Sequence, residues 1–175
     1  GANVPFGLVQ LGPTSIPQEW DWCSGYHDSD STVIGFSHTH LSGTGIGDLF
    51  DVTVMPVVGE VTFARGTEDD QASGLWSYAD RTREIARPGY YSVPLTRYGI
   101  TAEITATTRV GLHRYTSPQS EESAIVIDLQ NGGCWDKPVE TFIEPCGDNA
   151  LRGYRYSRGW ARDQRIYFYA EFSKP

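Results

Sequence analysis

The segment between residues 27 and 48 contains side chains that could bind a metal ion. His38 and His40 are two positions apart, so on a strand they would point to the same side and could share one ion, with Asp30 or Asp48 as a further ligand. No third ligand stands at a spacing known for a metal site, and histidines in such loops commonly bond to backbone carbonyl groups. We therefore expect no metal site in this chain.

Covalent and phosphate chemistry is not supported by the same segment. Ser37 or Ser42 could in principle form a Ser/His/Asp triad, but the G-x-S-x-G turn that presents a nucleophilic serine is absent. The glycine-rich residues 43–47 lack the lysine of a phosphate-binding loop and its strand-turn-helix context. The acidic residues of the second half, Asp136, Glu103, Glu140 and Glu144, cannot be paired across a bond from the sequence. None of these patterns by itself identifies a catalytic residue.

An aromatic residue beside a carboxylate offers a different chemistry. Trp20 and Asp21 are adjacent, and an indole face suits the C–H face of a sugar while a neighbouring carboxylate can accept hydrogen bonds from its hydroxyls. The alternative is that Trp20 and Trp22 pack beneath the loops. Chemistry alone leaves both interpretations open.

Composition narrows the classes of partner. The chain has 175 residues, 14 Lys and Arg against 22 Asp and Glu, and a formal net charge of −8. Such an acidic chain is a poor duplex nucleic-acid binder, and no apolar run approaches the about 20 residues of a transmembrane helix. The three cysteines Cys23, Cys134 and Cys146 allow one disulfide at most. Three small buried side chains and a Cys134–Cys146 bridge are both compatible with the spacing.

The second half of the chain has the patterns of β-strands. Apolar residues alternate with polar ones over 100–107, and the short glycine-containing link at 97–99 predicts a hairpin with 88–95. We expect a third strand at about 109–116. The run at 124–129 is typical of a strand buried on both faces, and 166–172 alternates with aromatic residues on both sides, so we expect both its faces to be covered too.

The first ninety residues differ, because turn residues crowd together there. Good helix formers occur only at 77–87, which we take as a short helix ended by Pro88-Gly89. Strands with turns between them and almost no helix predict an all-β antiparallel β-sandwich with long structured loops in the first ninety residues. We expect residues 1–175 to form one domain, and its functional residues to lie on those loops.

Several motifs occur in one order along the whole chain, in the segments 5–11, 23–27, 34–45, 88–93, 105–111 and 167–175. The most specific is the run Phe-Ser-His-Thr-His-Leu-Ser-Gly-Thr-Gly at 36–45. Together these motifs resemble the N-terminal domain of glycoside hydrolase family 92, the calcium-dependent α-mannosidases. One departure is Phe50, where the family usually has glycine, so the shape of that turn should differ.

The resemblance implies a β-sandwich that packs against a larger (α/α)6-barrel domain, with the active site between them. It implies that a secreted or periplasmic enzyme hydrolyses terminal α-mannose, with exo action and inversion of configuration. The expected preference is for α-1,2 linkages. Family members carry both catalytic carboxylates and the calcium ligands in the C-terminal domain. We therefore expect this chain to be a truncated N-terminal domain, inactive alone, with calcium needed only by the full-length enzyme.

The resemblance also assigns roles to loop residues. Trp20 would stack on the sugar of the leaving group, with Asp21, Cys23 and Gly25 beside it as substrate-binding residues. The remaining residues of the loop surface would face the barrel domain, as an interface or pocket wall: His27, His38, His40, Ser42, Gly43 and Thr44. The expected partners are that catalytic domain and a mannose-containing glycan, and the uncovered face could self-associate. The alternative is a stand-alone carbohydrate-binding module; an independent metal-dependent hydrolase that uses His38 and His40 is disfavoured.

Overall fold

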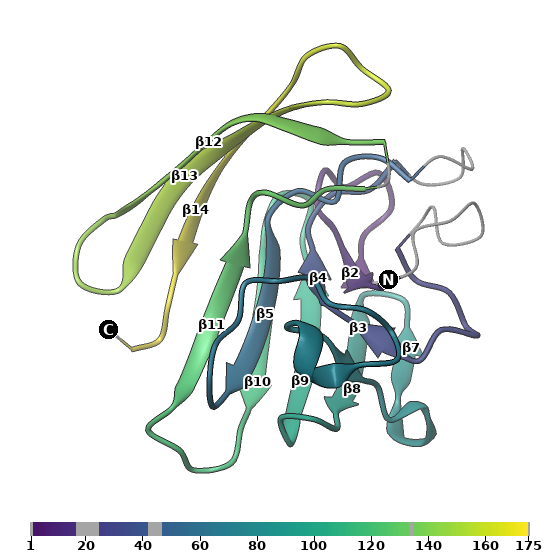
Figure 1. Cartoon of the computed structure of the whole chain (residues 1–175). Helices are drawn as coiled ribbons and strands as arrows, with labels where there is room; N and C mark the ends of the chain where they lie inside the picture. Colours follow the sequence, from purple (N-terminus) through teal and green to yellow (C-terminus); the bar gives the residue numbers. More distant parts are fainter. Residues whose placement is uncertain (1, 17–24, 42–46, 134, 175) are drawn as a thin grey trace.

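The computed structural model describes residues 2–16, 25–41, 47–133 and 135–174. Regular structure in these residues is almost entirely β-strand, arranged in antiparallel sheets (Figure 1). The predicted all-β antiparallel fold class is therefore confirmed. None of the short helical turns in this part of the chain has the length or apolar character needed to cross a lipid bilayer.

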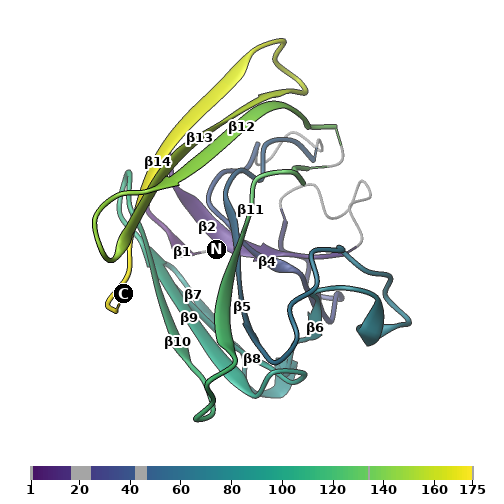
Figure 2. The same ribbon diagram turned by 60° about the vertical axis from the view of Figure 1, so that its left-hand side comes forward.

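Two sheets pack face to face. The first has the order β1-β2-β4-β5-β11 and the second the order β10-β9-β8-β7, and Figure 2 shows them as two layers. The first sheet consists of β1 (Ala2–Asn3), β2 (Gln10–Thr14), β4 (Gly35–Ser37), β5 (Thr53–Val58) and β11 (Ser123–Asp128). The second consists of β7 (Ile85–Arg87), β8 (Tyr90–Leu95), β9 (Ile100–Ala106) and β10 (Gly111–Thr116).

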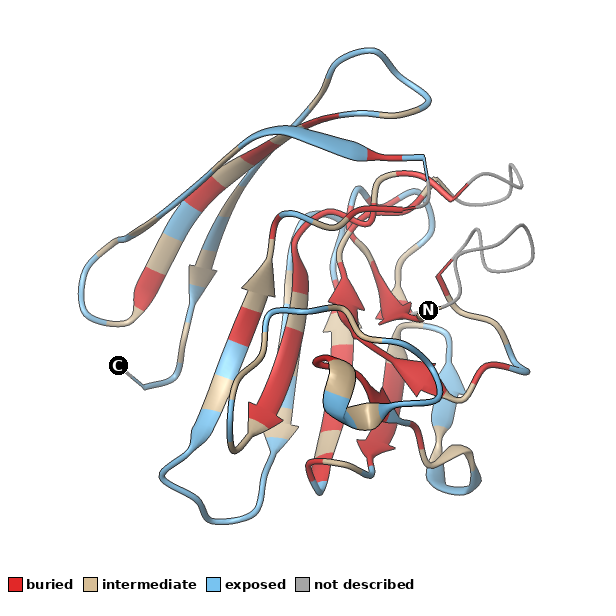
Figure 3. Cartoon of the chain, in the orientation of Figure 1, coloured by how far each residue is buried: buried red, intermediate tan, exposed pale blue. Residues whose placement is uncertain are grey.

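The hydrophobic core lies between these layers, where Figure 3 shows the buried residues gathered. Leu11, Phe36 and Met55 of the first sheet meet Val93 and Ile104 of the second, each 1% exposed or less. In β9 every second residue is buried, as the alternation at 100–106 predicts. The predicted hairpin also forms, with Leu95 opposite Ile100.

A third sheet lies at the opposite end of the sandwich from the β8–β9 turn (Figures 1 and 2). It has the order β12-β13-β14, with β12 at Lys137–Pro145, β13 at Ala150–Arg158 and β14 at Gln164–Glu171. A two-stranded sheet pairs β3 (Thr32–Val33) with β6 (Ser77–Tyr78). The residues that the structure describes also include the single 3₁₀ turns η2 (Gln71–Ser73) and η3 (Arg81–Arg83).

The predicted helix at 77–87 is wrong. The segment forms β6, the turn η3 and β7, because its backbone pairs with neighbouring strands: Thr96 N donates to Tyr78 O, and β7 pairs with β8. Asp80 caps only one turn, its carboxylate accepting from Thr82 N. Tertiary pairing here outweighs helix propensity, which is a weak preference.

Two predictions of double-sided burial are also wrong. β11 is an edge strand that pairs with β5, and Ile125 is 43% exposed. In β14, which confirms the predicted C-terminal strand, Tyr167 and Tyr169 are more than half exposed. In the described residues, each of these strands therefore carries large apolar or aromatic side chains on a face that the fold leaves exposed.

The third sheet is joined to the sandwich by one buried cation. The Arg155 guanidinium on β13 is fully buried; its Nη1 donates to Asp51 Oδ1 at 2.6 Å, its Nη2 to Asp136 Oδ1, and its Nε to Leu129 O at 2.8 Å. The other oxygen of each carboxylate accepts a hydroxyl, from Thr39 and Ser157 respectively. Burial raises the pKa of Asp136 above its usual range despite these donors. The segments that carry Asp51 and Asp136 must therefore assemble together with β13 around the charge of Arg155.

Replacing Arg155 with methionine should destabilise the protein strongly. The substitution leaves two carboxylates buried without their cation, which costs about 3–5 kcal/mol. The measurement is the free energy of unfolding from urea titration. Arg165→Met is the matched control on the neighbouring strand, where the Arg165 side chain is 57% exposed; equal loss in both variants would contradict the role given to Arg155.

Candidate functional site

The site begins with a strained segment at residues 47–52, next to the predicted loop. Leu49, Phe50 and Val52 all have positive φ, at 69°, 59° and 53°, which costs non-glycine residues about 1–2 kcal/mol each. The predicted departure at Phe50 is thus a phenylalanine in a conformation that glycine adopts freely. Its ring is 1% exposed and packs edge-on against His40 at 4.7 Å between centroids, so burial offsets the strain.

Hydrogen bonds hold this segment at almost every residue. Thr39 accepts from Phe50 N at its carbonyl and from Asp51 N at its hydroxyl. His38 N donates to Asp51 O, and Arg155 holds the Asp51 side chain. Strain that is overdetermined in this way is common at functional sites.

Asp48 fixes the β13–β14 turn above the segment. Its Oδ2 accepts from Trp160 N and from Gln164 Nε2, both at 2.9 Å. Its Oδ1 is buried and has no hydrogen-bond partner in the structure. Gly159 packs directly on this carboxylate, since a Cβ there would lie 2.7 Å from Asp48 Cγ. Asp48 therefore positions the β13–β14 turn through its side chain.

Two tryptophans are positioned by the same segment. Trp135 N donates to Gly47 O at 3.1 Å, and Trp160 N to Asp48. Their rings are nearly parallel, at 24° and 6.3 Å between centroids, and are 54% and 63% exposed. We call Trp135 and Trp160 the tryptophan pair. It is an exposed apolar surface on a rigid base, of the kind that stacks on a sugar.

Sequence reasoning missed the tryptophan pair. The two residues are 25 positions apart, and only pairing of β13 with β14 and anchoring at residues 47–48 bring them together. A usable signal was a glycine shortly before each tryptophan: Gly133 stands two residues before Trp135, and Gly159 directly precedes Trp160. A Cβ at either glycine would collide with residues 47–48.

The two predicted histidines are structural in their contacts. His38 Nδ1 donates to Val52 O at 2.7 Å, so its Nε2 accepts from His113 Nε2 at 3.0 Å, and His113 Nδ1 accepts from the Tyr115 hydroxyl at 2.6 Å. This chain of bonds links the loop after β4 to β10 across the sandwich. The sequence did not reveal it, because His38 and His113 are 75 residues apart.

His40 belongs to a separate chain of bonds. Its Nδ1 donates to Gln10 O at 2.7 Å, and its Nε2 accepts from the Ser37 hydroxyl at 3.0 Å. Gly25 backs onto the same ring, because a Cβ there would lie 2.7 Å from His40 Nε2. His38 and His40 therefore have different partners and do not point at a common ion. Among the described residues no three His, Cys, Asp or Glu side chains cluster in a way that could hold a metal.

The other predicted residues are placed as follows. The His27 ring contacts the Ser29 hydroxyl at 2.8 Å, and its carbonyl accepts from Arg81 Nη2. Cys146 is a free thiol, so it forms no bridge. Six predicted site residues lie outside the described residues: Trp20, Asp21, Cys23, Ser42, Gly43 and Thr44. Cys134 lies outside them as well. Their roles stay predictions.

The whole chain, residues 1–175, matches the model of the glycosyl hydrolase family 92 N-terminal domain. The chain belongs to this family. A family 92 α-mannosidase from Bacteroides thetaiotaomicron superposes with a TM-score of 0.94 at 38% identity, over 99% of this chain and 24% of that one, and a complex of it with mannoimidazole superposes with 0.93 at 37% identity over 99% and 23%. The resemblance seen in the sequence is thus confirmed.

More distant relatives agree with this assignment. The family 92 glycosyl hydrolase ccman5 superposes with a TM-score of 0.78 at 26% identity, over 99% of this chain and 24% of that one. An uncharacterized secreted glycosidase of Arthroderma benhamiae is 28% identical over 139 residues, which is 74% of this chain and 17% of the relative. The chain therefore spans about a quarter or less of the length of these family 92 proteins.

The buried histidines make stability depend on pH. Burial lowers the pKa of His113 to about 3 and of His40 to about 4, and it lowers the pKa of His38 as well. The unfolded chain, with histidine pKa near 6.5, binds more protons below that pH. The contribution of these histidines to stability is therefore fully present above pH 6.5 and is lost as the pH drops.

His113→Gln should retain most stability at pH 7 and flatten the decline in the free energy of unfolding between pH 7 and 5, measured by urea titration. The raised pKa of Asp136 changes stability with pH in the opposite direction, but it does so equally in the wild type and in the variant. If stability declined with pH equally steeply in His113→Gln and in the wild type, a buried neutral His113 would be contradicted.

Gly159→Ala should loosen the base of the tryptophan pair. The added methyl group would enter the space of the Asp48 carboxylate, at a cost of about 1–3 kcal/mol. Gly12→Ala is the matched control, since its Cβ would meet only His40 Cε1 at 3.7 Å, an ordinary contact. The measurements are thermal unfolding and the tryptophan fluorescence maximum. Equal effects of both substitutions would contradict the packing described for Gly159.

Proposed function

We propose that this chain forms one wall of the substrate pocket of a longer, secreted or periplasmic α-mannosidase. The wall consists of the tryptophan pair, residues 47–52 beneath it and the loop residues predicted from the sequence, Trp20 foremost. It would bind the leaving-group sugar of a mannose-containing glycan and contact the catalytic domain. The tryptophan pair carries the proposal, because it is exposed, rigid and apolar on a domain whose relatives are glycosidases.

The carboxylates at this end support a binding role rather than a catalytic one. Both Asp51 oxygens are engaged, by Arg155 and Thr39. Asp48 is 1% exposed and accepts two hydrogen bonds at one oxygen. A general acid must reach the glycosidic oxygen and its partner must activate water across about 6.5–9.5 Å in an inverting enzyme. Neither carboxylate is free to do so, and we assign the exo-acting, inverting chemistry to the catalytic domain.

Calcium is assigned to that domain for a similar reason. Calcium takes six to eight oxygen ligands, whereas the buried carboxylates described here bond to a guanidinium and to backbone or side-chain N–H groups. These residues do not fit a calcium site. We propose that the longer enzyme binds the ion elsewhere.

Mannose release from α-1,2-linked mannobiose tests the proposal. The 175-residue chain should release none, and a longer protein that includes the catalytic domain should release mannose with calcium and lose activity with chelator. Turnover by the chain alone would contradict the proposal and direct attention to His38, His40 and a nearby carboxylate.

Trp20→Ala in the longer protein should lower kcat/KM for the same substrate by about tenfold or more, since a leaving-group contact acts in the transition state as well as in the ground state. Phe63→Ala is the matched control, because Phe63 is 79% exposed and no role is proposed for it. Equal rates for Trp20→Ala and Phe63→Ala would contradict the role of Trp20.

A stand-alone carbohydrate-binding module is the second candidate. The exposed aromatic residues of β14 favour it, because exposed rings can stack on a sugar without a second domain.

A further inference from the structure

The third sheet has an aromatic outer face, on the side opposite Arg155. The strand register places Phe142, Tyr154 and Tyr167 in one row across β12, β13 and β14, and Arg152 and Tyr169 in the next row. Phe142, Tyr167 and Tyr169 are 42%, 66% and 61% exposed. Aromatic side chains this exposed on a regular sheet indicate a binding surface rather than a core.

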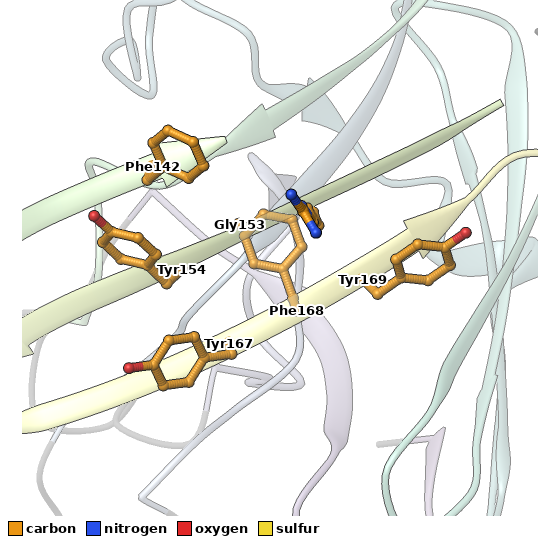
Figure 4. A pocket seen from close by; sticks show the side chains of 7 residues that line it. Phe142, Gly153, Tyr154, Tyr167, Phe168 and Tyr169 are labelled. Atoms are coloured by element: carbon orange, nitrogen blue, oxygen red, sulfur yellow. The ribbon is translucent and has the colours of Figure 1, made fainter. Parts of the chain in front are cut away.

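A shallow cavity of about 510 Å³ lies between these rows, within the range of about 300–1,000 Å³ that is usual for ligand sites. Figure 4 shows the rings of Tyr154 and Tyr167 leaning to one side and that of Tyr169 to the other, with Gly153 between them. The cavity is lined by Phe142, Arg152, Gly153, Tyr154, Tyr167, Phe168 and Tyr169. We call it the tyrosine cavity.

The rings on one side of the cavity are held in place before any ligand binds. Tyr154 stacks between Phe142, at 5.4 Å and 20°, and Tyr156, at 4.5 Å and 21°. The Tyr154 hydroxyl donates to Glu140 at 2.5 Å, and the Tyr156 and Tyr167 hydroxyls share a hydrogen bond of 2.7 Å. A preorganised surface loses little conformational entropy on binding.

Charge limits the class of occupant. Arg152 is the charged residue of the lining, and it already pairs with Glu144 at 2.6 Å. The hydrogen bond with Tyr167 raises the pKa of Tyr156 to about 12, so the Tyr156 phenol beside the cavity stays neutral near pH 7. Aromatic faces, hydroxyls and a compensated cation suit a neutral polyhydroxylated ligand better than an anion or a lipid surface.

We infer that the tyrosine cavity binds a neutral mannose-containing oligosaccharide at a position separate from the tryptophan pair. The inference rests on the proposed function for the identity of the sugar. Tyr167 and Tyr169 would contact the C–H faces of a sugar ring, and their hydroxyls with the Arg152–Glu144 pair would bond to its hydroxyls. A branched glycan could then contact the domain at two places, which would retain the substrate near the catalytic pocket.

Titration of the 175-residue chain with an α-linked mannotriose tests this inference, by calorimetry and by tyrosine fluorescence. Tyr169→Ala and Tyr167→Ala should each weaken binding by about tenfold, and Tyr169→Phe, which keeps the ring and loses one hydroxyl, should weaken it less than Tyr169→Ala does. Phe63→Ala is the matched control outside the cavity, at a residue that is 79% exposed and has no proposed role, and it should not affect this binding.

The outcomes separate this inference from the proposed function. No binding by the wild type at about 10 mM mannotriose, or binding lost in Trp160→Ala and kept in Tyr169→Ala, would overturn the cavity and leave the pocket proposal standing. A dimer that Tyr169→Ala dissociates, without sugar binding, would make a second copy the occupant and also overturn it. Binding lost only in the tyrosine variants would support the cavity even if the longer protein released no mannose.

Discussion

The structure depends on the need to neutralise one buried cation. Arg155 brings a full charge into the interior of the protein, where an unpaired ion costs several kcal/mol, and Asp51 and Asp136 supply the opposite charge from two other parts of the chain. Pairing with Asp51 fixes the strained segment at 47–52, and that segment in turn anchors Trp135 and Trp160. The exposed surface of the site is therefore held in place by ion pairs in the interior.

Local pattern predicted those parts of the fold that are determined locally. The alternation at 100–106 and the hairpin link at 97–99 identified β9 and its pairing with β8. The segment at 77–87 was mistaken for a helix, because its pairing partners lie elsewhere in the chain. The burial of β11 and β14 was overestimated, since apolar composition does not say which face of a strand is covered.

The family motif located part of the candidate site but did not reveal its physical basis. The run at 36–45 drew attention to His38 and His40, whose rings bond inside the domain, to Val52 and His113 and to Gln10 and Ser37. Contacts between residues tens of positions apart, such as His38 with His113 or Asp48 with Trp160, leave no trace in local spacing. The departure at Phe50 was visible in the sequence, and it marks the strained turn.

The most direct test of a substrate-binding role is a crystal structure of a longer protein that contains this chain, with a mannose-configured inhibitor bound. The account predicts that Trp20 or the tryptophan pair lies within about 4 Å of the sugar or of the catalytic domain around it, with no carboxylate of residues 1–175 at the scissile bond. A structure in which this end of the domain faces solvent, far from the sugar, would contradict the account.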